Sequence, residues 1–214
     1  MSTKKEFINI KIKSGNRFYT SSKNPIKGAE KVETKLGDYY HTEVPNIKSN
    51  KLLSVGVYDS PYGEVLQFLM EGEGETILSF SIPTINSKGR LDSFAASAAR
   101  YLGNLEVGKP IEISLNKKDT NPNGYLYANM FFRQGGEENV RWVFDNDDVP
   151  PGTEKINKVT KKSEYDYQDR DAFLYDKIKE ACKNLKGSKS TLDNYPVAKS
   201  EMKIVPVDDD DLPF

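Results

Sequence analysis

This chain of 214 residues has one cysteine, one histidine and one tryptophan. The lone Cys182 excludes an intrachain disulfide, and the lone His41 excludes a histidine-rich metal site, which rules out zinc-finger and zinc-deaminase chemistry. No serine or cysteine lies near His41 in an arrangement that suggests a nucleophilic triad. We therefore expect Cys182 to be a small buried side chain and His41 a turn or surface residue. The same absences predict no metal, no cofactor and no enzymatic activity.

The sequence also lacks a long apolar segment. No apolar run approaches the roughly 18 residues that a membrane helix needs. Residues 7–13 alternate apolar and polar side chains instead of forming the apolar centre of a secretory signal. An acidic stretch from Asp145 begins like a calcium loop, but Pro150 and Ile156 stand where that loop needs glycine and glutamate. These features predict a cytoplasmic protein without a membrane or calcium site.

Charge is distributed unevenly along the chain. The net charge is −1, yet residues 1–51 hold eleven Lys and Arg against five Asp and Glu, a balance of +6. Residues 136–214 hold thirteen against eighteen, a balance of −5. A basic front and an acidic back are typical of a nucleic-acid binder that carries a protein-recruiting tail.

Alternating apolar and polar residues predict a mostly β fold in the first two thirds of the chain. After a first strand at 7–13 and a polar stretch at 14–35, we expect strands at 51–58, 64–70 and 75–83, a helix over 92–103, and strands at 109–117 and 125–133. Asp92 is a candidate N-cap of this helix, and Gly103 can end it. Three strands, a helix and two strands follow the order of an OB-fold, a five-stranded Greek-key barrel. Residues 140–144 are a candidate for one more strand.

The composition changes near residue 150, where residues 146–152 contain breakers of secondary structure. A helix is predicted over 169–186, because Leu174, Ile178 and Ala181 recur at helical spacing. This apolar stripe needs a partner surface, either the barrel or another subunit, so a homo-oligomer is an open alternative. We divide the chain into an OB-fold domain with a basic N-terminal region (1–150), a linker and C-terminal helix (151–187), and a flexible tether with an acidic tip (188–214).

The strand at 125–133 combines aromatic and cationic side chains on one face. The pleat places Tyr125, Tyr127, Phe131 and Arg133 together, and apolar residues take the other face. Unpaired bases stack on such rings, and a guanidinium holds phosphate or stacks as well. The alternative is that the tyrosines pack under the N-terminal region. Trp142 has two open roles, a core residue or a base contact.

Further DNA contacts are expected where a charge lies beside an aromatic ring or at the edge of an OB-fold groove. They come from the first strand, the segment after it, the hairpin around residues 60–63 and the loop after the third strand. The candidates are Lys11, Lys13, Arg17, Tyr19, Tyr58, Tyr62, Lys88 and Arg90.

The last seven residues are Asp208, Asp209, Asp210, Asp211, Leu212, Pro213 and Phe214. A partner pocket can take the Phe214 ring, a basic residue can take its carboxylate, and further cations can meet the aspartates. A merely solubilising tail accounts for the aspartates but has no use for a bulky aromatic end. We therefore expect this tip to bind partner proteins.

The tip resembles the acidic end of bacterial-type single-stranded DNA-binding proteins, the SSB family, in which several Asp precede a small aliphatic residue, Pro and a terminal Phe. The resemblance covers residues 208–214. It implies that the tip recruits replication, recombination and repair proteins and competes with DNA for the groove of the OB-fold. The basic N-terminal region, the helix at 169–186 and the short polar tether point to a bacteriophage or mobile-element member acting in a bacterial cytoplasm.

The sequence thus predicts a protein that coats single-stranded DNA in replication, recombination and repair and recruits partners through its tip. One alternative is an adaptor or decoy that binds host DNA-repair enzymes through the tip without binding DNA. DNA and RNA are not separated by these residues, because stacking is indifferent to the sugar.

Overall fold

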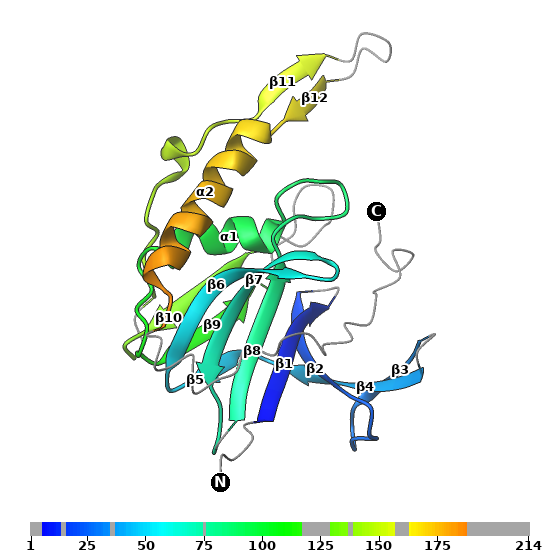
Figure 1. Ribbon diagram of the computed structural model, residues 1–214. Coiled ribbons are helices and arrows are strands. Elements are labelled where there is room, and N and C mark those ends of the chain that lie inside the picture. The colour runs from blue at the N-terminus through cyan, green and yellow to red at the C-terminus, as the bar shows by residue number, and fades with distance from the viewer. Residues whose placement is uncertain are drawn as a thin grey trace.

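The computed structural model describes residues 6–13, 16–34, 37–74, 76–116, 129–136, 139–156 and 163–187. These residues form a mostly β protein with one large open mixed sheet, two smaller sheets and two α-helices (Figure 1). None of the described helices has the length and apolarity needed to cross a lipid bilayer. The strands are β1 (Glu6–Lys13), β2 (Arg17–Ser22), β3 (Glu30–Thr34), β4 (Gly37–Val44), β5 (Ile47–Ser49), β6 (Leu52–Ser60), β7 (Gly63–Glu71), β8 (Thr76–Pro83), β9 (Ile111–Leu115), β10 (Met130–Gln134), β11 (Thr153–Ile156) and β12 (Ser163–Asp166); the helices are α1 (Ser93–Leu102), the short 3-10 turn η1 (Asn146–Asp148) and α2 (Gln168–Asn184).

The large sheet has the order β3-β4-β2-β1-β8-β7-β6. β6, β7 and β8 form the predicted antiparallel series, and a two-residue turn at Pro61 and Tyr62 joins the first two. Gly63 follows this turn with a φ of 112°, a value that favours glycine. The predicted order of three strands, helix and two strands is therefore confirmed as β6, β7, β8, α1, β9 and β10.

The predicted barrel is not closed among the described residues. β1 pairs in parallel with β8 from Glu6 to Ile10, so this edge of β8 is occupied by the N-terminal strand. β10 pairs with β9, and β9 pairs with β5, which gives a separate three-stranded sheet. The polar stretch after β1 is also more ordered than its composition indicates, because it supplies β2 and β3 and leads into β4.

The core lies between one face of the large sheet, the three-stranded sheet and the helices. Phe68 stacks on both Phe80 and Phe132, with ring centroids 5.7 Å apart in each pair. α1 begins as predicted, because the Asp92 carboxylate accepts a hydrogen bond from the Phe94 backbone N–H at 2.8 Å. Its small buried side chains, such as Ala98, allow the helix to approach the sheet closely.

α2 is the predicted C-terminal helix, and its apolar stripe packs on the same chain. Leu174 and Ile178 are 2% and 0% exposed and belong to the same apolar cluster as the sheet residues. The helix contacts α1 and β6. After it, the Leu185 carbonyl accepts a hydrogen bond from the Val55 backbone N–H at 3.1 Å. The body of the protein is thus the partner surface that the sequence left open, and Cys182 on this helix is buried as expected.

Candidate nucleic-acid interface

β1 and β2 bring four of the predicted contact residues together. In this antiparallel pair, Lys11 lies opposite Tyr19 and Lys13 lies opposite Arg17. Residues directly opposite each other point to the same side of a sheet. Since their neighbour Ile10 is buried in the core, these four side chains occupy the other side of the sheet.

This side continues across β8, β7 and β6, where polar side chains lie beside a small apolar cluster of Leu53, Leu69 and Ile77 with Phe7 packed against it. Ser79 is 1% exposed, so part of this side is buried. Asn9 pairs with Ser79, and Gln67 pairs with Ser81, so their side chains share it. Gln67 Nε2 donates a hydrogen bond to Ser79 Oγ at 2.8 Å. Tyr58 lies opposite Val65 and completes the row. We call this surface the polar sheet face and define it by Asn9, Lys11, Lys13, Arg17, Tyr19, His41, Tyr58, Gln67, Ser79 and Ser81.

The three cations of the polar sheet face differ in their partners. Lys13 forms an ion pair with Glu30, and Arg17 pairs with Glu43 at 3.3 Å. Lys11 forms no ion pair with any described residue, although its side chain is half-buried. Burial lowers the pKa of Lys11, because the ammonium loses water without gaining a counter-ion. Lys11 is therefore the cation of this face whose charge is uncompensated within the described chain.

Two aromatic side chains on this face pack against neighbouring residues. The ring centroids of Tyr19 and His41 are 4.5 Å apart, with the planes tilted by 36°. A Cβ added to Gly56 would lie 2.8 Å from Tyr58 Cε2, so the Tyr58 ring covers this glycine. Burial raises the pKa of both Tyr19 and Tyr58. The face thus offers rings that are already ordered before a ligand binds.

His41 is a residue of the face that the sequence assigned elsewhere. We expected a turn or surface histidine, but His41 lies within β4 and packs against the Tyr19 ring. Its Nδ1 is buried and has no hydrogen-bond partner among the described residues. Burial lowers the pKa of His41, and Lys13 lowers it further by repulsion. The pairing of β4 with β2 brings His41 to the polar sheet face. The residues next to His41 in the sequence do not indicate this pairing.

The predicted loop residues have different roles. Tyr62 is 56% exposed at the tip of the β6–β7 hairpin, and Lys88 is exposed in the loop between β8 and α1. Arg90 is engaged elsewhere, because its Nε donates a hydrogen bond to Asp171 Oδ2 at 2.6 Å. Its guanidinium also lies 4.9 Å from the centre of the Tyr167 ring. Arg90 therefore links this loop to α2. Its guanidinium is already engaged within the chain, whereas Tyr62 and Lys88 are exposed to a ligand.

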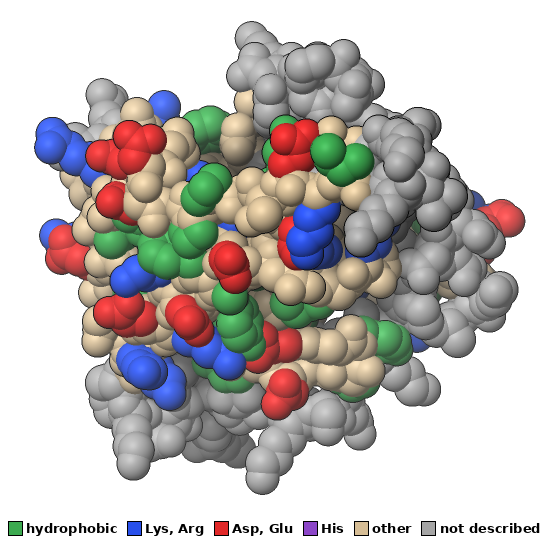
Figure 2. Space-filling view, turned by 90° about the horizontal axis from the view of Figure 1, so that it is seen from above, with side chains coloured by type: hydrophobic (Ala, Val, Ile, Leu, Met, Phe, Trp, Pro, Cys, Tyr) green, Lys and Arg blue, Asp and Glu red, His purple; other side chains and the backbone are tan. Residues whose placement is uncertain are grey.

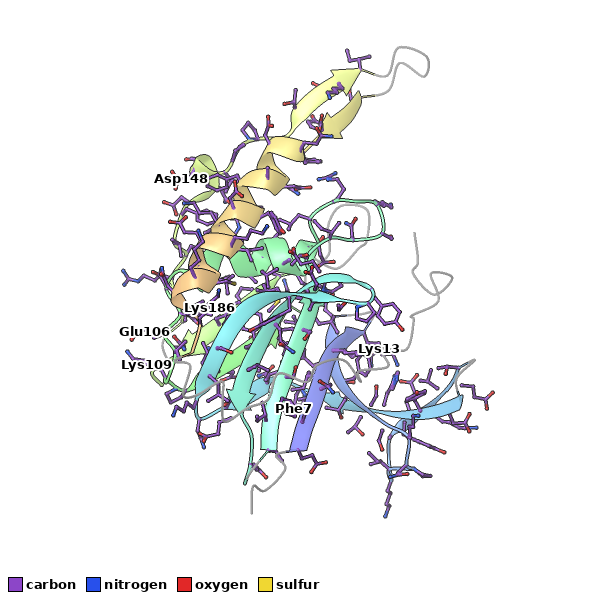
Figure 3. The ribbon with its side chains drawn as sticks, viewed as in Figure 1. Phe7, Lys13, Glu106, Lys109, Asp148 and Lys186 are labelled. Atoms are coloured by element: carbon purple, nitrogen blue, oxygen red, sulfur yellow. The ribbon has the colours of Figure 1, made fainter. Side chains whose placement is uncertain are left out.

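Phe131 and Arg133 lie on β10, away from the polar sheet face. The predicted alternation is confirmed there, since Met130 and Phe132 are buried and Phe131 is 42% exposed. Asp148 comes a few residues after the segment that runs beside β10. In Figure 3, Asp148 and Lys13 lie at opposite sides of the molecule. The candidate contacts thus form two separate groups. Tyr125, Tyr127 and the tip Asp208 to Phe214 lie outside the described residues.

Trp142 is not a core residue. It is 44% exposed, and residues 140–144 form no strand. One side of its indole is covered by Arg100, whose guanidinium carbon lies 4.8 Å from the ring centre. Of the two roles left open by the sequence, packing in the core is therefore wrong.

Charges of both signs are interspersed on the face seen from above in Figure 2, so the described part of that face has no extended surface of one sign. No group of three His, Cys, Asp or Glu side chains that could hold a metal ion occurs among the described residues. No family model, curated protein or solved structure matches this chain.

Proposed function

We propose that this protein binds single-stranded DNA on the polar sheet face and recruits other proteins through its C-terminal tip. The proposal includes an OB-type topology in which β6, β7 and β8 form the first three strands, α1 follows, and β9 and β10 are the last two. OB-folds bind oligonucleotides on their second and third strands, which correspond here to β7 and β8. In this protein β1 and β2 widen that surface and add Lys11, Lys13, Arg17 and Tyr19 to it.

The observation that carries the proposal is the environment of Lys11. A half-buried ammonium loses hydration, and a bound anion would offset this cost. No described residue supplies that anion. A phosphate of a single strand would supply it, and the neighbouring Tyr19 ring would meet a base next to that phosphate. Duplex DNA suits this face less well, because its bases are paired and their faces are covered.

The tip supports the second half of the proposal by its chemistry. Four carboxylates followed by Leu212, Pro213 and Phe214 match a pocket that has a hydrophobic floor and a basic rim. The proteins that bind this tip would be replication, recombination or repair proteins of a bacterial cytoplasm. The protein itself would be encoded by a bacteriophage or a mobile element.

Substitution of Lys11 tests the DNA half of the proposal. Lys11→Ala removes one phosphate contact, so we expect the affinity for oligo-dT at low salt to fall about tenfold, because a hydrogen bond to a charged group is lost. The slope of log affinity against log salt falls in magnitude by about 0.7 for a single strand. The matched control is Lys109→Ala, a lysine that pairs with Glu106 at 2.9 Å and lies on the other side of the view from the labelled Lys13 in Figure 3.

Fluorescence anisotropy with labelled oligo-dT, an RNA of the same length and a duplex measures these affinities. Equal losses of oligo-dT affinity in Lys11→Ala and Lys109→Ala would show that Lys11 does not contact the DNA. If the intact protein binds no single strand at low salt, the DNA-binding proposal fails, and the adaptor or decoy function becomes the better account of the tip.

A further inference from the structure

A pocket of about 460 Å³ lies beside β10, on the side of the molecule away from the polar sheet face. Phe131 and Phe132 line it from β10, and residues 139–142 and Asp145 line it from the following segment. The order of the elements explains the hollow, because this segment leaves β10 after Asn139 and passes along the end of α1 without forming a strand.

Two aromatic rings of the pocket are exposed where packing would ordinarily bury them. Phe131 is 42% exposed and Trp142 is 44% exposed. The indole is held in place, since Arg100 covers one side of it and Tyr101 meets it edge-on, with centroids 6.4 Å apart and planes at 81°. Because Trp142 lines the pocket, its remaining surface is open to a flat ligand.

The arginines of this chain divide into two groups. The six are Arg17, Arg90, Arg100, Arg133, Arg141 and Arg170. Three of them form ion pairs with described carboxylates: Arg17 with Glu43, and Arg90 and Arg170 with Asp171. The other three form no ion pair with any described residue, and all three lie around this pocket.

Each unpaired arginine has a defined place there. Arg100 stacks on Trp142 and donates a hydrogen bond to the Asn146 amide oxygen at 2.6 Å, a neutral partner. Arg133 donates from Nε to Asn139 Oδ1 at 3.0 Å, and Arg141 lines the pocket itself. Two exposed rings and three guanidinium groups that have no counter-ion among the described residues are suited to a ligand that is both aromatic and anionic.

We infer that this pocket takes one unpaired base of a single strand onto Trp142 and Phe131, while Arg100, Arg133 and Arg141 hold the phosphates on either side of that base. The inference rests on the proposed single-strand binding and adds a second contact site to it. Asp145 favours a base over an acidic peptide, because its carboxylate at the pocket repels consecutive carboxylates but accepts a hydrogen bond from a base N–H, such as N3–H of thymine.

Trp142 is the only tryptophan, so its emission reports on this pocket alone. With labelled oligo-dT at low salt, we expect saturating DNA to quench Trp142 emission. We expect Trp142→Ala to weaken binding about tenfold, because one stacked base is lost. Trp142→Phe, which keeps an aromatic face, retains most of the affinity. Tyr165→Ala removes another exposed aromatic, 55% exposed on β12, and leaves binding unchanged.

The outcomes separate this inference from the proposed function. Two results would refute base binding in the pocket while leaving the proposal for the polar sheet face intact. One is DNA binding by anisotropy with constant Trp142 emission, and the other is equal affinity of Trp142→Ala and the intact protein. Absence of any binding overturns both. Quenching by a peptide of residues 208–214, but not by oligo-dT, overturns the base pocket in favour of a peptide site. Circular dichroism confirms that the variants are folded, and quenching of Trp142 emission in the intact protein keeps the test valid if the alanine variant is not.

Discussion

Replacing Ile178 by alanine tests whether α2 shares one cooperative core with the sheets. Ile178 is 0% exposed and lies in the apolar cluster that includes Phe68 and Phe132. The substitution deletes three carbons, which at about 0.8 kcal/mol each contribute about 2.4 kcal/mol of transfer free energy. The cavity left between α2, α1 and β6 adds to this, so we expect the free energy of unfolding to fall by about 2–5 kcal/mol.

Urea unfolding followed by circular dichroism and by Trp142 emission measures this loss. The control is Glu180→Ala on the same helix, whose side chain is 67% exposed and pairs with Lys177, with an expected change within about 0.5 kcal/mol. A shared core predicts that both probes report one transition. Equal stability of Ile178→Ala and Glu180→Ala, or a helical signal that is lost before the Trp142 signal changes, would show that α2 is not part of that core.

Three further predictions concern His41, Cys182 and Phe214. Burial and Lys13 lower the pKa of His41 below its ordinary value of 6.5, so below pH 6.5 the unfolded chain binds a proton that the folded chain excludes. The free energy of unfolding is therefore highest above pH 6.5 and falls as the pH falls from 6.5 through the lowered pKa. If the urea midpoint of His41→Gln falls as steeply over this pH range as that of the intact protein, His41 is not the group responsible. Burial raises the pKa of Cys182 to about 11, so a thiol-specific reagent should label it only after unfolding, and rapid labelling of the folded protein would be inconsistent with its packing. Deletion of Phe214 should abolish capture of repair proteins in a pull-down while leaving or strengthening oligo-dT binding; unchanged capture would refute the role of the tip.

Some elements were predictable because their signals are local. The alternation in residues 7–13 identified β1, and the turn at Pro61 and Tyr62 identified the β6–β7 hairpin. Asp92 marked the beginning of α1, since an N-cap needs only the three residues after it. The apolar spacing from Leu174 to Ile178 identified α2 in the same way. The tip at 208–214 is likewise read directly from its residues.

The sequence by itself therefore determined β1, β6 to β10 and the two α-helices, with their order and buried sides, because periodicity and capping act over a few residues. It did not identify β2 to β5, β11 and β12. The tertiary structure decided which edges pair. β1 occupies the edge of β8 in parallel, which leaves the barrel open among the described residues, and β4 brings His41 to Tyr19. Such pairings join residues far apart in the chain, and an alternating pattern specifies a face of a strand but not its neighbour. The half-buried position of Lys11, which has no ion pair among the described residues, and the exposure of Trp142 follow from that long-range packing.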